Sequence, residues 1–119
     1  MNDLQVADFK EKTILITGAT NGLGKQTAEY FAPTGATLVI VGRNPEKTET
    51  LVRSLQAKPG AGSIHSLIAD LSSQDEIRRL ADAFKKQFTR LDILINNAGA
   101  LFTKHQTTAD GYEQTFALN

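Results

Sequence analysis

The stretch Thr17-Gly18-Ala19-Thr20-Asn21-Gly22-Leu23-Gly24 constrains the fold of this chain more than any other segment. It follows the apolar run 14–16 and precedes residues 25–31, which have a helical pattern. Glycine has no Cβ, so it adopts backbone angles that other residues avoid and lets the main chain approach a ligand closely. The free N–H groups at a helix start attract an anion. The stretch therefore predicts a strand, a glycine turn and a helix that bind a pyrophosphate.

The rest of the chain repeats this alternation of strand and helix. Apolar runs predict strands over residues 12–17, 37–41, 63–69 and 91–95. Helices are expected over 22–32, from the N-cap Asn44 to 57, and from Ser73 to 88, where Ser73-x-x-Glu76 forms a capping box. We expect a loop from 96 to about 107, and a last helix from Asp110 to Asn119.

Such alternation, without an internal repeat or a linker, predicts one α/β domain over residues 1–119. We expect a doubly wound parallel sheet, the Rossmann fold, with four strands in the order 3-2-1-4 and helices on both faces. The fourth strand would then be an unprotected edge, so we also expect marginal stability or self-association.

The carboxyl ends of the predicted strands carry four separate signals. The glycine turn, Arg43, Asp70-Leu71 and the segment 96–99 each follow a strand directly. Ligands of doubly wound sheets bind beyond these ends, at the switch point between strands 1 and 4. The coincidence of the four signals predicts a single nucleotide site.

Composition limits the other functions that the chain can have. The 13 basic and 13 acidic residues are mixed along the chain, so neither nucleic acid nor an anionic membrane is an expected partner. The lack of cysteine excludes disulfides and thiol catalysis, and the two histidines have no partners at metal-ligand spacing. No leader and no membrane span is predicted, so the cytosol is the expected location.

Arg43 bears on the choice of cofactor. It lies 19 residues after Gly24, where many dinucleotide-binding folds have an acidic residue that accepts hydrogen bonds from the adenosine ribose. A guanidinium can instead form a charge-assisted fork to a 2′-phosphate, which a carboxylate would repel. The chemistry favours NADP over NAD. The alternative is that Arg43 is simply solvated. Lys47 can assist Arg43 in binding the phosphate, or it can be solvated as well.

The remaining candidates have structural alternatives. Asp70 can accept a hydrogen bond from the adenine amino group, or it can cap the following helix. Asn96 and Asn97 can be turn residues that tie the loop to neighbouring strands, or they can contact the ligand. Both alternatives stay open for each residue.

Together, Thr17-Gly-x-x-x-Gly-x-Gly24, Asp70-Leu71 and Asn96-Asn-Ala-Gly99 resemble the short-chain dehydrogenase/reductase family, from residue 12 to 119. The segment 103–119 is similar to the branch of retinol-dehydrogenase-like enzymes and carbonyl reductases. The resemblance implies an NADP-dependent oxidoreductase in which these residues bind the cofactor: Gly18, Thr20, Asn21, Gly22, Leu23, Gly24, Arg43, Asp70, Leu71, Asn97, Ala98 and Gly99.

The resemblance also assigns roles to these positions. The glycine turn would hold the pyrophosphate, Asp70-Leu71 the adenine, and residues 97–99 the adenosine ribose. Arg43 matches the basic residue of NADP-preferring members, whereas Asn21 departs from the lysine or arginine that many of them have before the middle glycine. Asn119 matches the catalytic asparagine, which positions a water in a proton relay.

One part of the family's chemistry is missing from the 119 residues. Tyr30 and Tyr112 are followed four positions later by Thr34 and Phe116, so no Tyr-x-x-x-Lys is present. That pair, with an upstream serine, would protonate and polarise the carbonyl. We therefore expect the amino-terminal portion of a longer fold, inactive by itself, whose complete form transfers hydride between NADP(H) and a carbonyl or alcohol substrate.

Two other functions stay open on the sequence. The chain can be a non-catalytic module that senses a dinucleotide or binds a partner. A methyltransferase-like site for an adenosyl cofactor also uses a glycine turn, but its ribose is usually bound by an acidic residue, and Arg43 and the segment 96–99 argue against it.

Overall fold

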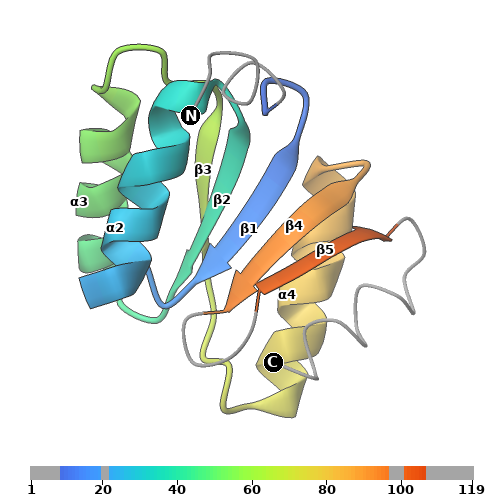
Figure 1. The fold of residues 1–119 in the computed structure, drawn as a ribbon. Coiled ribbons are helices and arrows are strands. Elements are labelled where there is room, and N and C mark those ends of the chain that lie inside the picture. Colours follow the sequence, from blue (N-terminus) through green and yellow to red (C-terminus); the bar gives the residue numbers. More distant parts are fainter. Residues whose placement is uncertain (1–8, 20–21, 97–100, 107–119) are drawn as a thin grey trace.

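The computed structural model describes residues 9–19, 22–96 and the backbone of 101–106, and these form a sheet with helices on both faces (Figure 1). The sheet has five strands in the order β3-β2-β1-β4-β5. The first four are parallel, as predicted. The strands are β1 (Thr13–Thr17), β2 (Thr37–Gly42), β3 (Ile64–Ile68), β4 (Leu91–Asn96) and β5 (Leu101–Gln106).

The helices cover the sheet unequally. Helices α2 (Gly22–Phe31) and α3 (Pro45–Gln56) lie on one face, and α4 (Gln74–Gln87) lies on the other (Figure 1). Each face has its own core, because alternate residues of the strands point in opposite directions. Ile14 and Ile16 pack towards α2 and α3, whereas Leu15 packs with Phe84 of α4.

The helix boundaries follow the predicted capping signals. Asn44 Oδ1 accepts a hydrogen bond from the Lys47 N–H at 3.0 Å, and Ser73 Oγ accepts one from the Glu76 N–H at 3.3 Å. Helix α2 ends at Phe31, one residue earlier than predicted, and a 3₁₀ turn (η1, Ala32–Thr34) that contains Pro33 follows it. Gly35 then adopts the left-handed conformation that ends this turn.

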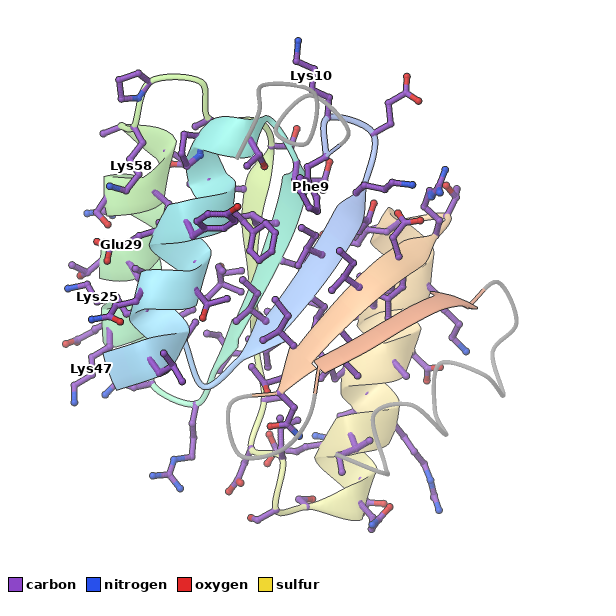
Figure 2. The ribbon with its side chains drawn as sticks, viewed as in Figure 1. Phe9, Lys10, Lys25, Glu29, Lys47 and Lys58 are labelled. Carbon is purple, nitrogen blue, oxygen red and sulfur yellow. The ribbon has the colours of Figure 1, made fainter. Side chains whose placement is uncertain are left out.

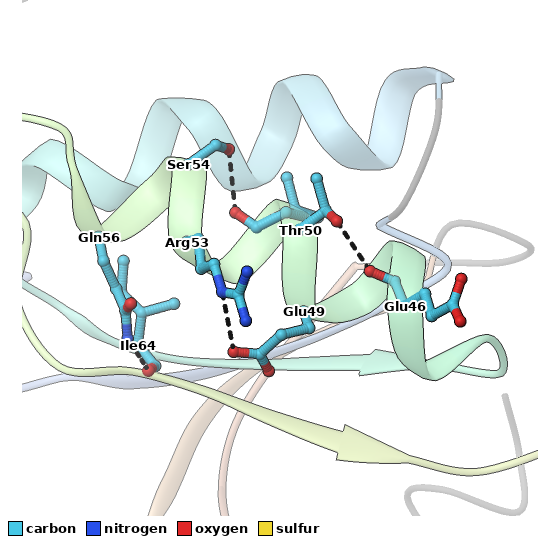
Figure 3. A network of polar contacts seen from close by, with 8 residues as sticks. Glu46, Glu49, Thr50, Arg53, Ser54, Gln56 and Ile64 are labelled. Atoms are coloured by element: carbon cyan, nitrogen blue, oxygen red, sulfur yellow. Dashed lines mark hydrogen bonds and ion pairs between the residues drawn. The ribbon is translucent and has the colours of Figure 1, made fainter.

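Helix α3 is fixed to the sheet at its far end. The Gln56 side-chain amide donates to the carbonyl of Ile64, the first residue of β3, at 3.2 Å (Figure 3). The exposed side of the helix has local contacts, such as the ion pair between Glu49 and Arg53 at 3.6 Å. The position of α3 therefore depends on its buried side and on its two ends.

A partly buried carboxylate, that of Asp92, joins the amino ends of β1 and β4. Asp92 Oδ2 accepts a hydrogen bond from the Thr13 N–H at 2.8 Å, and Oδ1 accepts one from Arg90 Nε at 3.1 Å. Burial raises the pKa of Asp92, but the hydrogen bonds from Arg90 and Thr13 outweigh it, so the net pKa lies below its ordinary value. Asp92 is thus an ionised link between the two central strands.

The prediction of a loop up to residue 107 is wrong for residues 101–106. These form β5, which pairs antiparallel with β4, for example Leu101 with Ile95. The four residues between β4 and β5 are too few for a parallel crossover, so only an antiparallel hairpin can join the two strands. The expectation that β4 is an open edge is therefore wrong as well. The predicted last helix, 110–119, lies outside the described residues.

No helix in the described part of the chain is both long and apolar enough to cross a membrane.

Candidate nucleotide site

A pocket of about 350 Å³ opens at the carboxyl ends of the strands. Small-molecule sites commonly have volumes of about 300–1,000 Å³. The pocket brings together three of the four predicted signals, which are the start of the glycine turn, Arg43 after β2 and Asp70-Leu71 after β3. Asn96, where the fourth signal begins, does not line it. The pocket is lined by Gly18, Val41, Gly42, Arg43, Ala69, Asp70, Leu71 and Ser72.

The glycine turn adopts the backbone that its sequence predicts. Gly18 has a φ of 64° and Gly22 a φ of 58°, both in the left-handed region. A Cβ at Gly22 would meet no atom within 4 Å, so the backbone angle and not space requires glycine there. Gly24 is buried within α2, and Leu23 is 73% exposed in its first turn. Thr20 and Asn21 lie outside the described residues.

Asp70 is held in one orientation by its own loop. The hydroxyl and the N–H of Ser72 donate to Asp70 Oδ1 at 2.7 and 3.0 Å. These two bonds hold the pKa of Asp70 below its ordinary value, and the charge of Arg43 lowers it further, against a smaller opposing effect of burial. Ser73, and not Asp70, caps α4. Asp70 is therefore an ionised acceptor at the pocket.

Glu76 supports this loop, a role that the sequence did not reveal. Its Oε1 accepts a hydrogen bond from the backbone N–H of Asp70 at 2.8 Å. The capping box Ser73-x-x-Glu76 was visible in the sequence, and such a glutamate usually bonds back to the N-cap residue. Here it reaches three residues further, and so ties the first turn of α4 to the pocket wall.

Arg43 is exposed, follows β2 directly and is one of the residues that line the pocket. Arg43 and Asp70 line the same pocket, and the positive charge of Arg43 contributes to the lowered pKa of Asp70. Lys47 is exposed on the outer side of α3 (Figure 2). Arg43 and not Lys47 is thus the basic residue that lines the pocket.

Asn96 has a structural contact at the switch point. Thr17 Oγ1 donates to Asn96 Oδ1 at 3.1 Å, and both residues are buried. This bond links the carboxyl ends of β1 and β4. It agrees with the structural alternative, in which Asn96 ties its loop to a neighbouring strand. Asn97, Ala98, Gly99 and Asn119 lie outside the described residues.

Comparison with known proteins identifies the family. The profile of the short chain dehydrogenase family matches residues 12–119. The chain is 37% identical to human retinol dehydrogenase 13 over 113 residues, which is 95% of this chain and 34% of that protein. It thus spans about a third of the length of the curated relatives that it matches.

Two solved structures have the same fold with bound dinucleotides. The RhlG/NADP active-site complex from Pseudomonas aeruginosa is 37% identical, with a TM-score of 0.67 over 75% of this chain and 35% of that chain. An NADH-dependent reductase, A1-R′, complexed with NAD is 36% identical, with a TM-score of 0.68 over 80% of this chain and 39% of that one. The glycine turn, the parallel sheet and these matches agree: this chain belongs to the short-chain dehydrogenase family, a family of nucleotide-binding oxidoreductases.

Proposed function

We propose that this chain is the NADP(H)-binding part of a short-chain oxidoreductase that, in complete form, transfers hydride between NADP(H) and a carbonyl or alcohol substrate. The observation that carries the proposal is the pocket in which Gly18, Arg43 and Asp70 meet beyond three parallel strands. One small cavity thus offers a backbone turn, a cation and a carboxylate. These are the groups that a phosphorylated adenosine needs.

Each part of the cofactor has a matching group in this chain. The left-handed turn at Gly18 and Gly22 brings the main chain and the start of α2 towards the pyrophosphate. Asp70, ionised and fixed by Ser72, accepts from the adenine amino group. Arg43 binds the 2′-phosphate through charge-assisted hydrogen bonds. When bound, the nicotinamide supplies or accepts the hydride.

We extend the proposal to Leu23 and to the site residues that the structure does not describe. Thr20 and Asn21 complete the pyrophosphate turn, and Asn97, Ala98 and Gly99 flank the adenosine ribose. Leu23 lines the turn from the start of α2. Asn119 is the catalytic asparagine that orients a water for the proton relay.

The 119 residues contain no Tyr-x-x-x-Lys. A general acid with a lowered pKa is needed to protonate the carbonyl oxygen as hydride arrives. We therefore expect no NADPH-dependent reduction of ketones or aldehydes by the 119-residue chain. The second function that the sequence left open is a module that senses a dinucleotide without turnover. Binding of NADP without turnover by a protein that has no Tyr-x-x-x-Lys elsewhere would support the sensing function.

Titration of both dinucleotides tests the cofactor assignment. Calorimetry with NADP⁺ and NAD⁺ should show tighter binding of NADP⁺, and Arg43→Ala should lower the NADP:NAD affinity ratio by about tenfold to a hundredfold, the worth of a charge-assisted hydrogen bond. Arg53→Ala is a matched control, since Arg53 is also exposed but lies near the far end of α3. An unchanged ratio in Arg43→Ala would refute the role of Arg43.

A further inference from the structure

Gly42 connects the two walls of the pocket. It is the last residue of β2, it is buried, and it precedes Arg43. Its carbonyl accepts a hydrogen bond from the Ala69 N–H at 3.0 Å, which holds it beside the residue that precedes Asp70. A displacement of Gly42 would therefore move Arg43, on one side of the pocket, relative to Asp70, on the other side.

Thr48 of α3 occupies the space that a side chain at Gly42 would need. A Cβ built on Gly42 would lie 2.0 Å from Thr48 Oγ1, 3.2 Å from its Cβ and 3.3 Å from its Cγ2. Thr48 is fully buried. Rotation of its side chain cannot clear this contact alone, because the Cβ stays close. The start of α3 and the end of β2 are thus in direct contact at this point.

The same threonine fixes the residue that follows Arg43. Thr48 Oγ1 donates to the carbonyl of Asn44 at 2.7 Å, and the Thr48 N–H donates to that carbonyl at 3.0 Å. Arg43 therefore lies between Gly42, whose missing side chain leaves the space that Thr48 fills, and Asn44, whose carbonyl accepts two hydrogen bonds from Thr48. Thr48 thus contacts the backbone on both sides of Arg43.

We infer that the contact between Gly42 and Thr48 is a positioning contact for cofactor choice: it directs Arg43 towards the 2′-phosphate and so sets the preference for NADP over NAD. The inference rests on the proposed function, because it assigns a second layer of residues to the same site. If the contact between helix and sheet were merely structural, its loss would lower the stability of the fold and would weaken the binding of both dinucleotides by the same factor.

Three variants test the inference by calorimetric titration with NADP⁺ and NAD⁺, with thermal unfolding measured in parallel. Gly42→Ala forces Thr48 away, so we expect the NADP:NAD affinity ratio to fall about tenfold, as when one charge-assisted hydrogen bond is lost. Thr48→Ala removes the hydroxyl that holds Asn44, and should lower the ratio in the same direction. Thr48→Ser keeps this hydroxyl and should retain the ratio of the unmodified chain.

Gly62→Ala is the matched control. A Cβ at Gly62 would lie 2.3 Å from the carbonyl oxygen of Gly35, so this substitution is also crowded, but at the amino ends of β2 and β3. It should lower the melting temperature without changing the ratio. Should Gly42→Ala fail to fold, the comparison of Thr48→Ala with Thr48→Ser decides.

The possible failures are distinguishable. Equal affinity of the unmodified chain for both dinucleotides would refute the proposed NADP preference itself. If the unmodified chain prefers NADP and Arg43→Ala removes the preference, but folded Gly42→Ala or Thr48→Ala keeps it, the positioning role is overturned and the proposed function stands.

Discussion

Replacement of Asp92 tests whether a partly buried carboxylate holds the two central strands together. Its side chain is 8% exposed and accepts hydrogen bonds from the Thr13 N–H and from Arg90. Asp92→Ala removes the charged acceptor and leaves the Thr13 N–H without it. Hydrogen bonds to charged groups contribute about 1.5–3 kcal/mol, and an unsatisfied buried donor costs about 1–3 kcal/mol. Because these two values overlap, we expect a loss of about 2–4 kcal/mol in the free energy of unfolding.

Asp92→Asn isolates the effect of the charge, because it keeps an oxygen that can accept from Thr13. The pKa of Asp92 in the folded chain lies below its ordinary value of 3.8. A carboxylate with a lowered pKa stabilises the fold above the unfolded pKa, and this contribution disappears as the pH falls through the folded pKa. The difference between Asp92→Asn and the unmodified chain should therefore be constant from about pH 7 to pH 5 and shrink below about pH 4.

Urea unfolding followed by circular dichroism between pH 3 and pH 7 measures this difference. Asp82→Asn is the control, since Asp82 is 60% exposed and pairs with Lys85 on the surface of α4. Exposed pairs contribute about 0.2–1 kcal/mol, so this control should change little at any pH. If Asp92→Asn matched the control at pH 7, or if its deficit persisted undiminished at pH 3, the reasoning would be wrong.

Two further predictions concern the loop that carries Asp70 and the core between α4 and the sheet. Glu76→Ala removes the acceptor for the Asp70 N–H. Calorimetry should show that the binding of NADP⁺ and of NAD⁺ is weakened by the same factor, because both cofactors carry adenine. A change in the ratio of the two affinities would contradict this role. Phe84→Ala should lower the free energy of unfolding by about 3–5 kcal/mol in urea titrations, because Phe84 is fully buried between α4 and the sheet. A loss below about 1 kcal/mol would show that the core collapses around the cavity.

The parallel strands and the helices were predictable because their signals are local. Apolar runs such as 14–16 mark strands that are buried on both faces, and the capping residues Asn44 and Ser73 lie next to the helices that they start. The convergence of Arg43 and Asp70 followed from topology, since the carboxyl ends of neighbouring parallel strands meet at one edge of a sheet.

The features that the sequence did not reveal depend on partners far along the chain. Asp92 bonds to Thr13, 79 residues away, and nothing near Asp92 in the sequence indicates that pairing. β5 contains polar residues throughout its second half and becomes a strand because the edge of β4 supplies its hydrogen bonds. The need for glycine at position 42 is set by Thr48, whose burial is known only once α3 is packed on the sheet.

The hydrogen bonds at the two ends of the β1–β4 pair have a consequence for ligand entry. Asp92 links these strands at their amino ends, and Thr17 with Asn96 links them at their carboxyl ends. Strands joined at both ends cannot spread apart to admit a ligand. The carboxyl ends of β1 and β4 are therefore preorganised, so a ligand that bound at this edge of the sheet would lose little free energy in ordering them.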